Sequence, residues 1–162
     1  MKGEKPISAL AEGLRLLSRR PLTTAGLRRR LARAFPPEEV AWAIERLQAM
    51  GYLDDRRFAQ NWVEARQTAR PRARWLVERE LESQGVPPPV AQEAVQFWDD
   101  ALLARRCAQQ WAPRLAGLPR PTFLRRLYAY LRRRGFSPSL ARQTALDAWA
   151  HRPQGGPLDQ VG

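Results

Sequence analysis

An internal repeat of 50 residues is the feature of this sequence that most limits its possible folds. When the sequence is compared with itself at a shift of 50 residues, apolar positions coincide in three successive copies. The coinciding sets are Leu27, Val77 and Leu127; Leu31, Leu81 and Leu131; and Val40, Val90 and Leu140. Such a period is typical of tandem repeat proteins, whose neighbouring units share a core because one unit buries too little apolar surface alone.

The apolar spacing within each copy predicts α-helices. Apolar residues recur three or four positions apart, and no stretch shows a sustained alternation of apolar and polar residues. Prolines that suit a first helical turn, such as Pro37 and Pro138, alternate with glycines that suit a helix end, namely Gly51, Gly85 and Gly135. The predicted helices are 7–19, 22–34, 37–50, 55–69, 71–84, 87–98, 100–114, 120–134 and 137–150. The predicted fold class is all-α, with three tandem three-helix repeats forming an elongated, curved array.

The same pattern predicts the domain organisation. We expect a disordered N-terminus at 1–6, three-helix repeats at 7–52, 53–99 and 100–151, and a disordered tail at 152–162. The N-terminus lacks the apolar stretch of a secretory signal, and no apolar run is long enough to span a membrane. A cytoplasmic monomer without membrane contact is therefore expected.

Positive charge is concentrated towards the C-terminal end. The formal net charge is +12, and residues 101–152 contain eleven arginines against one acidic residue, Asp147. Residues 1–100 carry 17 basic and 14 acidic groups. This uneven distribution of charge predicts a polyanionic partner such as nucleic acid, since basic side chains that neutralise phosphates release counterions. The alternative is a solvated basic face that only keeps the protein soluble.

Two helical segments carry the candidate contacts. In "RPTFLRRLYAYLRRRGFS", residues 120–137, the apolar side chains gather on one side of a helical wheel and the arginines on the other. In "RPRARWLVERELESQG", residues 70–85, Trp75 lies opposite the apolar side. Arginine can bind phosphate through two parallel hydrogen bonds, and an aromatic ring can stack on a base. The candidate residues for binding nucleic acid or a protein partner are Arg72, Arg74, Trp75, Arg79, Arg120, Arg125, Arg126, Tyr128, Arg132, Arg133 and Arg134.

Each of these candidates has a purely structural alternative. The arginines also suit a core helix whose charged ends reach solvent, and Trp75 also suits packing on an adjacent unit. The remaining tryptophans recur at helical spacing and are predicted to lie in the core. They are Trp42, Trp62, Trp98, Trp111 and Trp149.

No catalytic, cofactor or metal site is predicted, and we expect the protein not to be an enzyme. Cys107 and His151 are the only residues of their types, so an intramolecular disulfide and a Cys/His zinc site are excluded by count. Cys107 is expected to be a buried structural thiol. Asp54 and Asp55 form a carboxylate pair, but placement at a helix N-terminus explains them without catalysis.

One stretch, "GYLDDRRFAQNWVEAR" at residues 51–66, strongly resembles the signature of the RecX family, G-[YL]-[LI]-[DN]-D-x-x-[FY]-A-x-x-[YW]-V-x-x-R. "ELESQGV" at 80–86 and "LRRRGFS" at 131–137 are similar to two further family patterns. The resemblance spans residues 8–150 and departs at Gln84, where the family usually has a basic residue.

The resemblance implies a modular three-helix repeat protein that binds RecA filaments on single-stranded DNA. It implies inhibition of the strand exchange, ATPase and coprotease activities of RecA in DNA repair and the SOS response. Most contacts are then expected from the middle and last repeats, and double-stranded DNA is a further possible partner. Two alternatives stay open: a DNA-binding regulator of the winged-helix type, which needs a β-hairpin after Leu53, and an enzyme acting on nucleic acid.

Overall fold

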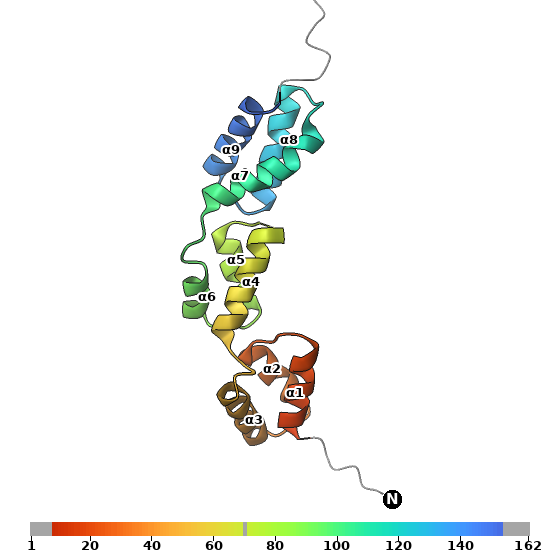
Figure 1. Ribbon diagram of the computed structural model, residues 1–162, viewed down its shortest axis with the longest axis vertical. Helices are drawn as coiled ribbons and strands as arrows, with labels where there is room; N and C mark the ends of the chain where they lie inside the picture. The colour runs from red at the N-terminus through yellow and green to blue at the C-terminus, as the bar shows by residue number, and fades with distance from the viewer. Residues whose placement is uncertain (1–7, 70, 154–162) are drawn as a thin grey trace, which may run out of the picture. The chain divides into compact units, whose positions relative to one another are not determined.

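The computed structural model describes residues 8–69 and 71–153, and within them the chain forms nine α-helices and one 3₁₀-helix without a β-strand (Figure 1). The helices are α1 Ala9–Arg19, α2 Thr24–Leu31, α3 Pro37–Ala49, α4 Asp55–Ala69, α5 Arg74–Ser83, α6 Pro88–Ala94, α7 Asp100–Trp111, η1 Ala112–Leu115, α8 Arg120–Arg133 and α9 Pro138–Ala150. This confirms the all-α fold of successive three-helix groups. The predicted disordered segment 1–6 and residues 154–162 of the predicted tail 152–162 lie outside the described residues. At the start of that tail, the Arg152 guanidinium donates a hydrogen bond to the Trp149 carbonyl at 2.9 Å.

The helix ends follow the signals in the sequence. The Asp54 carboxylate accepts a hydrogen bond from the Arg57 amide at 3.0 Å, so Asp54 caps α4. Gly51, Gly85 and Gly135 have φ of 76°, 96° and 90°, the left-handed conformation that favours glycine after a helix. The main differences from the predicted helices are that α2, α6 and α7 end earlier and that α5 begins three residues later; η1 follows α7 directly.

The described residues divide into two compact units. The first unit contains residues 8–65 and 77–97, and the second contains residues 66–69, 71–76 and 98–153. Because α5 contributes residues to both units, these units do not coincide with the three sequence repeats. The repeat boundaries therefore stay predictions.

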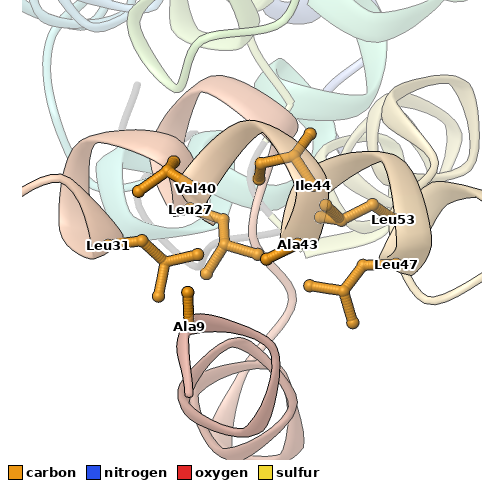
Figure 2. Packing of buried hydrophobic residues seen from close by; sticks show 8 residues of the cluster. All are labelled: Ala9, Leu27, Leu31, Val40, Ala43, Ile44, Leu47 and Leu53. Carbon is orange, nitrogen blue, oxygen red and sulfur yellow. The ribbon is translucent and has the colours of Figure 1, made fainter. Parts of the chain in front are cut away.

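In the first unit, α1, α2 and α3 enclose an apolar core (Figure 2). Its buried members are Ala9, Leu27, Leu31, Val40, Ala43, Ile44, Leu47 and Leu53. Burying a leucine side chain contributes about 1.5–3 kcal/mol, so these contacts hold α2 in a fixed orientation. Gly13 allows close packing of α1, since a Cβ there would lie 2.8 Å from Leu47 Cδ1.

The N-terminus of α2 is completed by residues that come much later in the chain. The buried Thr23 hydroxyl donates a hydrogen bond to the Gln84 carbonyl at 2.6 Å and accepts one from the Gly26 amide at 3.0 Å. The next amide, that of Thr24, donates to the Asp55 carboxylate at 2.8 Å. Polar groups at the α2 N-terminus thus obtain hydrogen-bond partners from two later places in the chain, the start of α4 and the turn between α5 and α6.

In the second unit the same joint recurs at α5, 50 residues later. The Ala73 amide donates to the Arg134 carbonyl at 2.9 Å, and the Arg74 amide donates to the Asp100 carboxylate at 2.7 Å. Ala73 and Arg134 are the shift-50 equivalents of Thr23 and Gln84. The two joints are thus similar but not identical, since Ala73 donates through its amide where Thr23 donates through its hydroxyl, and Asp100 lies 45 rather than 50 residues after Asp55.

The tryptophans are divided between core and surface. Trp98 is buried, and Trp62, Trp111 and Trp149 are half-buried. The prediction of a core position is wrong for Trp42, which is 54% exposed on α3. Helical spacing alone places a residue on a wheel but does not say how much of the wheel neighbouring helices cover.

Candidate nucleic-acid interface

The candidate surface on α8 is built on a rigid apolar side. Phe123, Leu127 and Leu131 are buried in the second unit, and their spacing fixes the opposite side of the helix towards solvent. Five predicted residues are exposed there: Arg120, Arg125, Arg126, Arg132 and Arg133. Tyr128 and Arg134 are half-buried. The predicted separation of apolar and basic sides on this helix is therefore confirmed.

The α8 arginines differ in how far their guanidinium groups are already engaged. Arg132 donates a hydrogen bond to the Phe136 carbonyl. Within the described part of the chain, the side chains of the other four exposed arginines have neither a hydrogen bond nor an ion pair. These four are Arg120, Arg125, Arg126 and Arg133. Because no acidic residue lies between Asp100 and Asp147, these groups can neutralise an external anion.

Arg134 belongs to an aromatic stack that the sequence did not predict. The rings of Trp111 and Tyr130 lie 4.6 Å apart at an interplanar angle of 3°. The Arg114 guanidinium lies 4.6 Å from the Trp111 ring centroid, and the Arg134 guanidinium lies 5.1 Å from the Tyr130 centroid. Cation–π contacts of this kind hold both arginines against the second unit. Arg134 is therefore less available to a ligand than its position beside Arg133 suggested.

Of the candidates near α5, three lie in the second unit: Arg72, Arg74 and Trp75. Trp75 is 52% exposed, and its indole N–H donates to the Gly135 carbonyl at 2.8 Å. This contact fixes one edge of the ring and leaves half of its surface in solvent. Trp75 thus packs on the turn after α8 and still presents an aromatic surface beside it.

The Arg74 amide donates a hydrogen bond to the Asp100 carboxylate at 2.7 Å. Burial raises the pKa of the Asp100 carboxyl, although the hydrogen bond from the Arg74 amide opposes this effect. The Arg74 side chain itself is exposed. The fourth candidate, Arg79, is exposed in the first unit.

A third set of arginines, which was not predicted as a candidate, lies at and after the end of α2; we name it the α2 cluster: Arg28, Arg29, Arg30 and Arg33. All four are exposed in the first unit. The net charge of residues 1–100 does not reveal this cluster, because that range also contains the acidic residues of 38–100. The available signal was local: residues 13–37 contain no acidic residue.

The structure differs from the winged-helix alternative in one required element. A winged helix needs a β-hairpin after Leu53, whereas residues 55–69 form α4. Within the described ranges, no group of three or more His, Cys, Asp or Glu residues is placed to hold a metal ion. In the same ranges, no helix combines the length and apolar character needed to cross a bilayer.

Cys107 is a buried thiol, as predicted. Its sulfur lies 3.6 Å from the Pro71 carbonyl oxygen, and burial raises the pKa of the thiol to about 11. The thiol thus stays protonated and unreactive at neutral pH.

Comparison with known proteins supplies the family context. Sequence profiles of the first and second three-helix domains of RecX match residues 9–47 and 54–95. The chain is 38% identical to the regulatory protein RecX of Thermobifida fusca over 132 residues, which are 79% of this chain and 71% of that protein. It is 34% identical to the RecX of Trichlorobacter lovleyi, covering 86% and 94% of the two chains. The crystal structure of RecX from Lactobacillus salivarius has the same fold, with a TM-score of 0.74 at 15% identity over 88% of this chain and 95% of that one.

Proposed function

Because this chain belongs to the RecX family of regulatory proteins, we propose that it binds RecA filaments on single-stranded DNA and modulates the recombinase. The observation that supports this function is the row of exposed, unpaired arginines on α8. In this proposal the protein is a cytoplasmic monomer that catalyses no reaction and acts only by binding to the filament.

The chemistry of a nucleoprotein filament suits this surface. Its DNA offers phosphates to Arg120, Arg125, Arg126 and Arg133, and each neutralised phosphate releases condensed counterions. Tyr128 and Trp75 offer aromatic surface to a base or to an apolar protein side chain. A protein bound in this way hinders filament growth, which would lower the ATPase, strand-exchange and coprotease activities that depend on the filament.

The first experiment measures the DNA-dependent ATPase of the cognate RecA while the protein is titrated in. We expect inhibition at substoichiometric amounts, because one bound protein obstructs many RecA subunits further along the filament. ATP turnover that stays constant across the titration would refute the proposed function.

The second experiment tests the α8 surface by charge reversal. The variant Arg125→Glu/Arg132→Glu/Arg133→Glu should bind filaments at least tenfold more weakly and retain its helical circular dichroism spectrum. The control Arg46→Glu/Arg56→Glu/Arg57→Glu changes the net charge equally at exposed positions outside α8. Equal weakening by both variants would assign the effect to overall charge and remove α8 from the interface. Parallel measurements with double-stranded DNA test the further partner.

A further inference from the structure

The N-terminal helices carry a strongly basic surface of their own. Residues 13–37 contain seven arginines and no acidic residue. We propose that the α2 cluster is a second binding site for the phosphate backbone of single-stranded DNA, separate from α8. This inference rests on the proposed function and adds a second DNA contact to it.

The orientation of α2 directs the cluster to solvent. Leu27 and Leu31 are buried against α1 and α3, with relative exposures of 0% and 1% (Figure 2). At about 100° per residue, Arg29 lies opposite these two leucines, and Arg28 and Arg30 lie on either side of it. Arg33 follows in the turn after the helix, where its amide donates to the Arg30 carbonyl at 3.3 Å.

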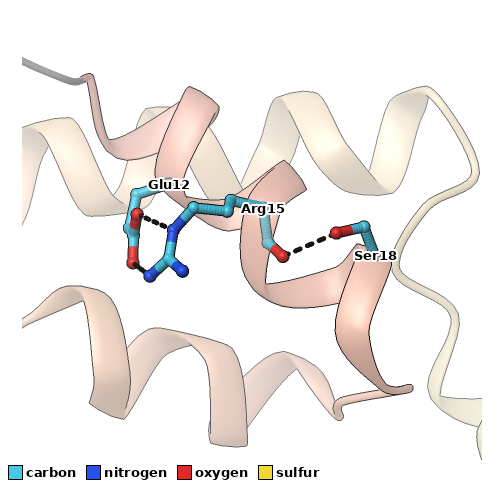
Figure 3. Close-up of polar contacts among 3 residues, drawn as sticks. All are labelled: Glu12, Arg15 and Ser18. Atoms are coloured by element: carbon cyan, nitrogen blue, oxygen red, sulfur yellow. Dashed lines mark hydrogen bonds and ion pairs between the residues drawn. The ribbon is translucent and has the colours of Figure 1, made fainter.

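The guanidinium groups of the cluster are available for a ligand. In the described residues, none of the four makes a hydrogen bond or ion pair through its side chain. Arg15, from the same acid-free stretch, shows the contrasting case: its guanidinium donates two hydrogen bonds to the Glu12 carboxylate (Figure 3). Arg56 is likewise paired with Glu93, at 3.0 Å.

Helix stability alone does not explain the cluster. A cation in the last turn interacts favourably with the helix dipole by about 0.3–1 kcal/mol, which accounts for a basic residue near the end of α2. Because the dipole effect is confined to that turn, it explains neither Arg33, which follows the helix, nor the absence of acidic residues from the neighbouring sequence.

The equivalent helix of the next repeat shows the pattern of a solvated surface. In α5, Arg74 and Arg79 are accompanied by Glu78, Glu80 and Glu82, so both signs are mixed. α2 and α8 instead carry arginines without acids. The charge pattern thus favours phosphate contacts from the first and last repeats, in contrast to the expected predominance of the middle and last.

The test compares two variants of the full-length protein with the same net charge. The test variant is Arg28→Gln/Arg29→Gln/Arg30→Gln, and the control is Arg46→Gln/Arg56→Gln/Arg57→Gln. Binding to a fluorescently labelled oligo(dT) is measured by anisotropy at several salt concentrations. Each lost phosphate contact lowers the salt slope by about 0.7 for single strands, so three lost contacts should lower it by about 2.

We expect the slope to fall in the test variant only, with at least tenfold weaker binding at low salt. An unchanged slope, or an equal decrease in the control, would overturn the inference. Weaker binding to RecA filaments with an unchanged slope on oligo(dT) would also overturn it, because the cluster would then contact an acidic protein surface. Circular dichroism confirms that both variants fold.

The outcome is independent of the test of the proposed function. If the wild-type protein binds oligo(dT) through the α2 cluster but leaves RecA ATPase unchanged, the DNA site stands and the proposed function fails. If RecA is inhibited but the slope does not depend on α2, only the second site fails.

Discussion

Replacement of Gly135 by alanine tests the joint between α8 and α5 directly. Gly135 has φ of 90°, and a Cβ added there would lie 2.4 Å from Leu76 Cδ1 and 3.3 Å from Ala73 Cβ. Non-glycine residues in the left-handed region cost about 1–2 kcal/mol, and overpacking a well-packed site adds about 1–3 kcal/mol. Gly135→Ala should therefore lower the free energy of unfolding by about 2–5 kcal/mol.

Gly51 provides a matched control. It has a similar φ of 76°, but a Cβ there meets no atom within 4 Å. Gly51→Ala should cost only the conformational part, about 1–2 kcal/mol. The two variants thus separate backbone strain from the close approach of Leu76.

The assay is urea unfolding followed by circular dichroism, with the single variant Leu76→Ala and the double variant Leu76→Ala/Gly135→Ala added to complete a cycle. Shortening Leu76 removes the closest contact, so the Gly135→Ala substitution should cost less in that background. Equal losses for Gly51→Ala and Gly135→Ala, or a Gly135→Ala cost that does not change with Leu76, would refute the packing described for this joint.

Two further predictions concern buried polar groups. Thr23→Val leaves the Gln84 carbonyl and the Gly26 amide without their hydroxyl partner. We therefore expect the free energy of unfolding, measured in urea, to fall by about 1–3 kcal/mol. The control Ser137→Ala removes an exposed helix cap and should lower it by roughly 1 kcal/mol or less. Cys107 should resist thiol reagents at pH 8 in the folded protein and react upon unfolding. In the folded protein the pKa of the Cys107 thiol is about 11, above its ordinary value of 9.0. As the pH rises from 9.0 to about 11, the thiol therefore ionises in the unfolded state but not in the folded state. The free energy of unfolding should fall by about 1.4 kcal/mol per pH unit over this range. Cys107→Ala should remove that part of the pH dependence, and an identical profile in both proteins would contradict the burial of the thiol.

The helical fold could be predicted because one pattern recurs along the whole chain. Leu27, Val77 and Leu127 coincide at a shift of 50 residues, and all three are completely buried. The end signals were equally local: each of the glycines predicted to end a helix adopts the left-handed conformation. Spacing and caps depend on neighbouring residues, which a single sequence displays.

Contacts between distant residues could not be predicted in the same way. Nothing in the local sequence pairs Trp111 with Tyr130, although their stack determines the surroundings of Arg134. The exposure of Trp42 likewise depends on how far neighbouring helices extend over α3. For the arginines, the sequence predicted which side of α8 they occupy, whereas the hydrogen bond from Arg132 to the Phe136 carbonyl depends on the path of the chain after α8.

The joint at α2 has a consequence for synthesis on the ribosome. Thr24 obtains its carboxylate partner only when Asp55 has been made, and Thr23 obtains its carbonyl partner only with Gln84. The first three helices can therefore emerge from the exit tunnel while Asp55 is still inside it and before Gln84 has emerged. The apolar core of these helices lies within residues 9–53, but the contacts of Thr23 and Thr24 are complete only after about one more repeat has emerged.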